Sequence, residues 1–200
     1  MKQYPSITNK VTPNAYIYAF DKLDGSNIRA EWHRKKGFWK FGTRTRLVDA
    51  SDPIFGTSPE LIRCKYEQSL SDIFIKERQE STICFFEFFG ASSRFGVHAA
   101  EPHDVVLIDA NLYKKGIINP KDFLKMFGSL HIAKLVYSGY AHHEFVQSVK
   151  DGTLPGMTFE GVVCKTGQIN PDMFKIKTNA WMDILKTHCH GDEEMFKRLA

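Results

Sequence analysis

Alternating apolar and polar positions predict an extended, strand-rich beginning of the chain. Residues 15–20 (AYIYAF) and 28–32 (IRAEW) have the period of two that is typical of strands. A polar stretch ending in glycine follows at 34–37 (RKKG), so 38–43 (FWKFGT) is predicted to return as the second arm of a hairpin. Further strands are predicted at 82–88, 104–110, 131–137, 159–165 and 173–177.

Helices are predicted where a capping residue and a proline precede apolar positions at helical spacing. Ser58 and Pro59 open such a segment, and its apolar positions from Ile62 to Phe74 predict one buried face. Asn119 opens a shorter helix that ends near Gly128. Strands outnumber helices and do not alternate with them regularly, so the expected class is α+β with largely antiparallel sheets. Further helices are predicted at 143–150, 180–186 and 192–199.

Composition places the chain among ordinary globular proteins. Of its 200 residues, 42% are hydrophobic and 25% are charged, which excludes a disordered, fibrous or disulfide-scaffold protein. The formal net charge of +4 is too small to indicate nucleic-acid binding by itself. The four cysteines form no CxxC pair, and no apolar run approaches a membrane span. We therefore expect a soluble intracellular protein with isolated buried thiols and no membrane partner.

Two segments combine charged side chains with unusual surroundings. Residues 22–27 (KLDGSN) place Lys22 between a strand and a tight turn, although a solvated lysine beside a plain hairpin would look the same. Residues 85–90 (FFEFFG) place Glu87 inside an aromatic strand. An unpaired buried carboxylate is costly, so Glu87 needs a partner or a polar cavity.

Two later segments add a carboxylate and more lysines. Residues 160–165 (EGVVCK) place Glu160 before an apolar strand and a lysine at its end. Lys175 and Lys177 lie on the same face of a strand, because strand side chains alternate with period two. Two neighbouring cations repel, and an anionic ligand would relieve the repulsion, although a solvated strand face remains an alternative.

Together and in this order, the four segments resemble the covalent nucleotidyltransferase superfamily of ATP- and NAD-dependent DNA ligases, RNA ligases and mRNA capping enzymes. That superfamily carries KxDG, a glutamate motif, EGVVxK and a KxK-type motif in the same order. The resemblance spans about residues 16–177 and is greatest to the second phage-type RNA ligase family, through KxDGSN and the EFFG segment. It implies an α+β nucleotidyltransferase (ATP-grasp-like) domain of largely antiparallel sheets flanked by helices.

The resemblance implies a role for each of these residues. Lys22 would attack the α-phosphate of ATP, and a lysine that does so at neutral pH needs a lowered pKa. Lys175 and Lys177 would supply neighbouring positive charge and stabilise phosphate oxygens. Glu160 would engage Mg²⁺ or Mn²⁺. The remaining implied nucleotide contacts are Glu87 to the ribose hydroxyls, and Asn27 and Arg44, in preference to Arg46, to phosphate or the nucleic-acid end.

Residues 29–46 interleave basic and aromatic side chains, which suits a polynucleotide surface, although a solvated hairpin over a core would have the same pattern. At residues 104–111 the resemblance places a strand that usually stacks an aromatic on the base, and here Leu107 and Ile108 stand there. An aliphatic contact is expected instead. The candidate polynucleotide contacts are Arg34, Lys35, Lys36 and Arg46.

The leading functional prediction is an ATP-dependent RNA ligase that forms lysyl-AMP, transfers AMP to an RNA 5′-phosphate and seals it to a 3′-hydroxyl. The alternatives are an ATP-dependent DNA ligase core, an mRNA-capping guanylyltransferase, or a non-enzymatic RNA-binding module with this fold. A nick, a tRNA break and a single-stranded end all remain open as substrates. We expect a cytoplasmic monomer that is active in RNA repair, with a phage-encoded origin as one alternative.

The expected organisation is a single adenylyltransferase domain over residues 1–200. Only 23 residues follow Lys177, which leaves no room for an OB-fold domain of the kind that DNA ligases and capping enzymes add. Residues 180–200 are expected to form a short helical C-terminal extension.

Overall fold

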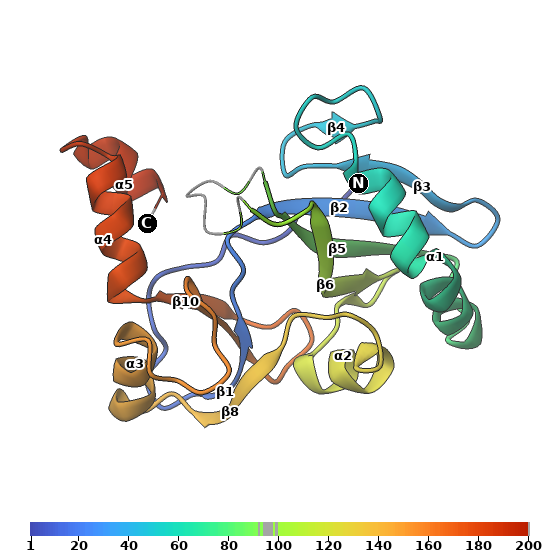
Figure 1. Cartoon of the computed structure of the whole chain (residues 1–200). Helices are drawn as coiled ribbons and strands as arrows, with labels where there is room; N and C mark the ends of the chain where they lie inside the picture. The colour runs from blue at the N-terminus through green and yellow to red at the C-terminus, as the bar shows by residue number, and fades with distance from the viewer. Residues whose placement is uncertain (92, 94–97, 99, 200) are drawn as a thin grey trace. The chain divides into compact units, whose positions relative to one another are not determined.

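The strands form two antiparallel sheets, shown in Figure 1. The structure is a computed structural model, and it describes residues 1–91, 93, 98 and 100–199. One sheet has six strands in the order β4-β3-β2-β5-β6-β7, and the other has four in the order β10-β9-β1-β8. Neighbouring strands in both sheets run antiparallel. The expected α+β class with antiparallel sheets is confirmed.

The chain divides into two compact units, each built around one sheet. The six-stranded unit contains Met1–Pro5, Gly25–Ala133 and Gln168–Pro171. The four-stranded unit contains Ser6–Asp24, Lys134–Gly167 and Asp172–Ala200.

Helix α1 supplies the core of the six-stranded unit. Its residues Ile62, Tyr66, Leu70 and Phe74 follow the helical period and are all buried. Tyr66 packs against Phe86 with 5.1 Å between the ring centroids. One face of the sheet is thereby covered by a helix, as the apolar spacing predicted. The elements of this unit are β2 (Ser26–His33), β3 (Gly37–Gly42), β4 (Leu47–Val48), α1 (Ser58–Lys76), β5 (Ser81–Phe89), β6 (Asp104–Leu112), β7 (Gly116–Ile117) and α2 (Pro120–Phe127).

The core of the four-stranded unit lies on one face of its sheet. Phe145 and Val149 of α3 pack there against alternate residues of the strands. The strand residues of this core are Ile17, Ala19, Val162, Cys164, Phe174 and Ile176, whose intervening neighbours lie on the opposite face. The elements of this unit are β1 (Tyr16–Asp21), β8 (Leu135–Tyr140), α3 (His143–Lys150), β9 (Gly161–Thr166), β10 (Met173–Lys177), α4 (Asn179–His188) and α5 (Glu193–Leu199).

The strand predicted at 131–137 forms, but it is shifted to Leu135–Tyr140, because the first residues of the predicted segment lie beside β6 instead. Ala133 donates its N–H to the carbonyl oxygen of Leu107 at 2.9 Å, beside β6 of the six-stranded unit. Strand β8 begins only at Leu135, continues to Tyr140 and pairs with β1. A hydrophobicity pattern does not record such a change of partner.

The helix starts differ from the prediction by one residue or not at all. The residue that caps α1 is Thr57, and Ser58 lies one position later, inside the helix. The cap of α2 agrees with the prediction, because the Asn119 side chain accepts a hydrogen bond from the N–H of Asp122 at 2.8 Å.

In the described part of the chain, the helices are too short or too polar to cross a membrane.

Candidate active site

Lys22, Glu160 and Lys177 come together at one end of the four-stranded sheet. Strand β9 runs antiparallel to both β1 and β10, so its beginning lies beside the ends of the other two. The N–H of Lys22 donates to the carbonyl oxygen of Gly161 at 2.9 Å, and the N–H of Thr178 donates to that of Glu160 at 3.0 Å. Backbone hydrogen bonds therefore hold all three positions.

The Glu160 carboxylate bridges two lysines. Its Oε2 lies 2.8 Å from Lys22 Nζ, and its Oε1 lies 3.5 Å from Lys177 Nζ. The Glu160 side chain is only 4% exposed, so these cations provide the compensation that a buried carboxylate requires. Lys177 Nζ also lies 3.5 Å from the centroid of the Trp181 ring and donates to the carbonyl oxygen of Leu199 at 3.0 Å.

Four lysines share the sheet face that carries this carboxylate. Directly opposed residues of antiparallel strands lie on the same face. Lys175 of β10 is opposite Val163 of β9, and Val163 is in turn opposite Phe20 of β1. Lys165 of β9 is opposite Tyr18 of β1. Because side chains alternate along each strand, this face, here called the lysine face, carries Lys22, Lys165, Lys175 and Lys177.

Burial and mutual repulsion disfavour the charged form of two lysines on the lysine face. Burial, together with the neighbouring charges of Lys175 and Lys22, lowers the pKa of Lys177 to about 7, although Glu160 opposes the shift. Burial and the charge of Lys22 also lower the pKa of Lys175. An anion bound here would favour the protonated form of these lysines.

Asp21 helps to orient the neighbouring Lys22. Its side chain lies on the opposite sheet face from Lys22 and accepts hydrogen bonds from the N–H and the hydroxyl of Thr158, at 2.7 and 3.0 Å. Burial raises the pKa of the Asp21 carboxyl despite these hydrogen bonds. Since neighbouring side chains alternate between faces, anchoring Asp21 on one face directs Lys22 toward the lysine face.

Gly161 allows the close approach of β9 to β10 beside Glu160. Its φ is +136°, a conformation that other residues rarely adopt. A Cβ at this position would lie 2.8 Å from the Cα of Lys177 and would collide with the carbonyl oxygen of Ile176. Glycine is therefore required between Glu160 and the apolar strand.

Asn27 and Glu87 lie opposite each other at one end of the six-stranded sheet. They are a register pair of β2 and β5, so their side chains share a face. Asn27 Nδ2 donates to the carbonyl oxygen of Phe86 at 3.4 Å. A Cβ at Gly25 would lie 3.0 Å from Glu87 Cγ and against the carbonyl oxygen of Phe88, which explains why the tight turn needs glycine.

Arg44 and Arg46 lie in the turn that leaves β3 at this same end. Arg29 of β2 holds the turn, because its guanidinium donates to the carbonyl oxygens of Thr43 at 2.8 Å and Met1 at 2.7 Å. Arg46 forms an ion pair with Asp52, and Arg44 is exposed.

The remaining polynucleotide candidates lie elsewhere in this unit. Arg34, Lys35 and Lys36 form the exposed tip of the β2–β3 hairpin. At ~3.3 Å per residue they are roughly 20 Å along β2 from Asn27. The predicted basic hairpin therefore has two separate basic ends.

The two positions expected to contact the base differ in accessibility. Leu107 is opposite Phe86 and fully buried. Ile108 is only partly buried and lies in a bulge, because the next register pair joins Asp109 to Phe85.

The sequence analysis noted Lys165 only as the lysine at the end of segment 160–165, and it did not single out Trp181 or Tyr4. Lys165 follows Gly161 by four residues, so the period of two could have placed it on the lysine face. Trp181 gave no such indication, because it reaches Lys177 from the following helix α4. Tyr4 donates to Asp109 at 2.6 Å, and burial and Asp109 raise the pKa of its hydroxyl well above the ordinary value.

No protein-family model matches the chain, and no match is found among curated proteins. Solved structures of RNA ligases are nevertheless similar over most of its length. An archaeal ATP-dependent RNA ligase matches with a TM-score of 0.69 and 14% identity, over 94% of this chain and 52% of its own. A Naegleria gruberi RNA ligase variant with ATP and Mn matches with a TM-score of 0.68 and 13% identity, over 92% of this chain and 57% of its own.

These likenesses establish the fold. The chain has the nucleotidyltransferase fold that it shares with these RNA ligases, as the motif resemblance implied. It spans about half of the length of the ligases that it matches.

Proposed function

We propose that the chain is the adenylation module of an ATP-dependent RNA ligase. The observation that carries this proposal is the 2.8 Å contact between Lys22 Nζ and the buried Glu160 carboxylate on the lysine face. Its fold, shared with ATP-dependent RNA ligases, and the order of its four motifs support the same reading.

In the proposed reaction, Lys22 Nζ attacks the α-phosphorus of ATP. A nitrogen–phosphorus bond forms, the bond from phosphorus to the bridging oxygen breaks, pyrophosphate leaves, and Nζ loses a proton. Lys175 and Lys177 are suited to hold the phosphate oxygens, because both are cations on the sheet face that carries Lys22. AMP then passes to an RNA 5′-phosphate, and a 3′-hydroxyl displaces it as the strands join.

The residues also fit a divalent cation such as Mg²⁺ or Mn²⁺. Among the residues that the structure describes, no group of three or more His, Cys, Asp and Glu side chains could form a protein-only metal cage. Mg²⁺ usually binds through one or two carboxylates together with substrate phosphates, and Glu160 beside the lysine face offers that donor set. When bound there, the cation would stabilise negative charge on the phosphate oxygens.

The finer assignments belong to the same proposal. Glu87 would bind the ribose hydroxyls, while Asn27 and Arg44 would contact phosphate or the RNA end. The substrate would carry a 5′-phosphate and a 3′-hydroxyl, and the enzyme would act as a monomer in RNA repair. A reducing, cytoplasmic setting suits the unpaired thiols, of which Cys84, Cys164 and Cys189 are buried.

Labelling with ATP radioactive in the α-phosphate tests the covalent step. The parent protein should retain label on a denaturing gel, whereas Lys22→Ala should retain none, because the acceptor nitrogen is gone. Lys150→Ala, which removes an exposed lysine of α3, is the matched control and should label like the parent. A labelled Lys22→Ala protein would overturn the nucleophile assignment.

Two comparisons separate the alternative functions. Label from GTP instead of ATP would identify a capping enzyme, and absence of label from both would leave an RNA-binding module. Sealing of matched nicked RNA and nicked DNA distinguishes an RNA ligase from a DNA ligase. The Lys22→Ala variant should still seal RNA that already carries 5′-AMP, because that step does not use the lysyl adduct.

A further inference from the structure

Three turns meet at one end of the six-stranded sheet, opposite to the end that carries Asn27 and Glu87. His33, the last residue of β2, pairs with Ser81, the first residue of β5. Thr82 of β5 pairs with Leu112, the last residue of β6. Neighbouring strands are ~4.8 Å apart, so the turns that follow β2, precede β5 and follow β6 lie within about 10 Å of one another.

These three turns, together with Lys76 at the end of α1, hold an unusual amount of positive charge. Residues 34–36, 76–80 and 113–115 contain seven Lys and Arg against two Glu, an excess of five positive charges. The whole chain has a formal net charge of only +4. The charged side chains of this basic end are all exposed: Arg34, Lys35, Lys36, Lys76, Glu77, Arg78, Glu80, Lys114 and Lys115.

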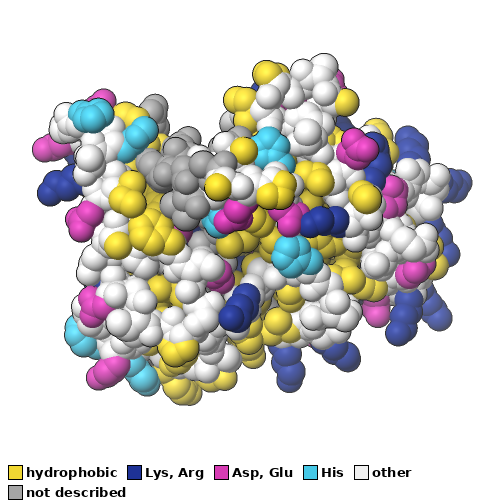
Figure 2. All heavy atoms as spheres, viewed as in Figure 1, with side chains coloured by type: hydrophobic (Ala, Val, Ile, Leu, Met, Phe, Trp, Pro, Cys, Tyr) yellow, Lys and Arg dark blue, Asp and Glu magenta, His cyan; other side chains and the backbone are white. Residues whose placement is uncertain are grey.

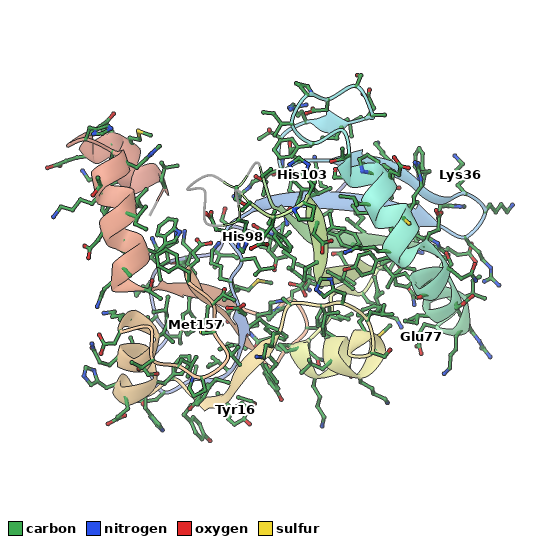
Figure 3. All side chains as sticks on the ribbon, viewed as in Figure 1. Tyr16, Lys36, Glu77, His98, His103 and Met157 are labelled. Carbon is green, nitrogen blue, oxygen red and sulfur yellow. The ribbon has the colours of Figure 1, made fainter. Side chains whose placement is uncertain are left out.

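The figures show this clustering of positive side chains at the same end of the sheet. Lys36 and Glu77 are labelled at the same end of the six-stranded unit in Figure 3. Lys and Arg side chains gather at the right-hand border over this end in Figure 2. Arg34 and Glu80 form an ion pair at 3.5 Å, so part of the acidic charge is already neutralised within the surface.

Exposed aromatic rings accompany the cations. Trp39 is 41% exposed and Tyr113 is 53% exposed. Lys36 Nζ lies 4.4 Å from the centroid of the Trp39 ring, and Lys114 Nζ lies 5.2 Å from that of Tyr113. Cations interleaved with exposed rings suit nucleic acid, which offers both phosphates and stacking bases, better than an acidic protein surface.

Backbone conformation adds a further indication. Arg78 and Lys114 both have positive φ, of 55° and 60°, where glycine or asparagine would be easier to accommodate. Two cations of this surface therefore occupy strained turn positions.

We propose that the basic end binds the phosphate backbone of the RNA substrate at a distance from the reacting nucleotide. This inference rests on the proposed function and extends it to a remote contact. Ser81 and Glu87 are the near and far ends of β5, roughly 20 Å apart at ~3.3 Å per residue. Stacked nucleotides advance by about 3.4 Å each, so the contacts fall about six nucleotides from the Glu87 end.

Binding of a fluorescent RNA of about 20 nucleotides, measured from about 50 to about 200 mM salt, tests the proposal. The fourfold variant Lys76→Gln, Arg78→Gln, Lys114→Gln and Lys115→Gln should bind at least tenfold more weakly at low salt. Each lost phosphate contact should reduce the slope of log affinity against log salt by about 0.7, so the variant should lose about 3 in slope. The matched control replaces four exposed lysines of the four-stranded unit: Lys10→Gln, Lys150→Gln, Lys186→Gln and Lys197→Gln.

An unchanged slope in the fourfold variant, or an equal loss in the control, would overturn the proposal. A second arm uses RNA of about 5 nucleotides, which is too short to contact the basic end and the Glu87 end together, so it should bind the parent protein more weakly than the long RNA does. Poly-glutamate is the competitor for an acidic protein partner. If it displaces the long RNA as well as unlabelled RNA does at equal charge, the surface is a general polyanion site and the RNA assignment is wrong.

Lysine adenylation in the same proteins separates this inference from the proposed function. The fourfold variant should label with ATP as the parent does, which also shows that it is folded. If no protein in the series labels but the salt slopes differ as expected, the basic end still binds RNA and the ligase assignment fails. If labelling is intact and the slopes coincide, the ligase assignment survives and the basic end is excluded.

Discussion

Glu160 is the residue that balances charge on the lysine face. A carboxylate with 4% exposure needs cationic partners, and Lys22 and Lys177 supply them at 2.8 and 3.5 Å. In the proposed reaction Lys22 must leave this ion pair and lose a proton before it can attack. The phosphates and cation that bind beside Glu160 would replace the interactions that the two side chains give up.

The pKa of about 7 at Lys177 predicts a pH-dependent affinity for ATP. Bound phosphates favour the protonated lysine, so affinity is full below pH 7 and falls as the pH rises through the pKa of the free protein. Above that pKa, the affinity for ATP should fall by nearly tenfold for each pH unit. Calorimetry with an ATP analogue that has a methylene bridge between the α- and β-phosphates measures binding without reaction.

Lys177→Arg is the comparison for that experiment, because an arginine stays charged throughout this range. Its affinity should stay nearly level between about pH 7 and 9, apart from changes that both proteins share. Identical profiles for the two proteins would remove Lys177 from the phosphate site.

At the scale of elements, the register of three strands builds the lysine face. Backbone hydrogen bonds between β1 and β9 and between β9 and β10 bring Lys22, Glu160 and Lys177 to the same level along the strands. A shift of one residue in any strand would turn its side chains to the core face. The register of the sheet therefore determines which side chains form the lysine face.

Gly161→Ala tests how far the site depends on this register. A Cβ at residue 161 would meet the backbone of Ile176 and Lys177, and the φ of +136° is strained for alanine. We expect a loss of stability of about 2 kcal/mol or more and at least a tenfold loss of adenylation, because β9 must move away from β10. Thermal unfolding and ATP labelling measure the two effects.

The control for this substitution is Gly167→Ala. Nothing lies within 4 Å of a Cβ built at Gly167, and its backbone is not in the positive-φ region. This variant should match the parent in both measurements. Equal behaviour of the two alanine variants would show that the close approach at Gly161 is unimportant.

The sequence predicted strand faces better than it predicted strand partners. Period-two alternation correctly grouped Lys175 with Lys177, because it is a local property of one strand. It could not place these lysines beside Lys22, about 150 positions earlier, without the motif resemblance. The two-residue strands β4 and β7 are too short to show any period, and the segment before β8 changes sheets within four residues.

Distance along a strand explains the main revision to the candidate site. Residues 29–46 formed one basic group in the sequence, but the hairpin separates its tip at Lys36 from Arg44 by the length of β3. Conversely, Lys76 and Lys115 are far apart in sequence and lie near the hairpin tip through strand pairing. Linear charge patterns miss such surfaces, because they arise from register.

At the scale of the whole molecule, each unit has its own sheet and its own buried core. The proposed phosphate-binding lysines all belong to the four-stranded unit, whereas the basic end belongs to the six-stranded unit. Small-molecule binding and RNA binding should therefore respond to different substitutions.

The thermal stability of the full chain offers a last test of the lysine face. A ligand that binds only the folded state at about 100 times its dissociation constant stabilises by ~2.7 kcal/mol, which for 200 residues raises the melting temperature by roughly 5–11 °C. The Lys22→Ala background prevents covalent reaction, so the measured shift reports ATP binding alone. In that background we expect the full shift with ATP and a divalent cation.

Adding Lys175→Ala and Lys177→Ala should reduce that shift to about 1 °C or less, because the phosphates lose two cationic partners. Adding Lys150→Ala and Lys186→Ala instead removes two exposed lysines of the same unit, and it should leave the shift unchanged. Any general effect of lower positive charge would appear equally in both backgrounds. A full shift in the first protein would place the triphosphate away from the lysine face, whatever the labelling of Lys22 shows.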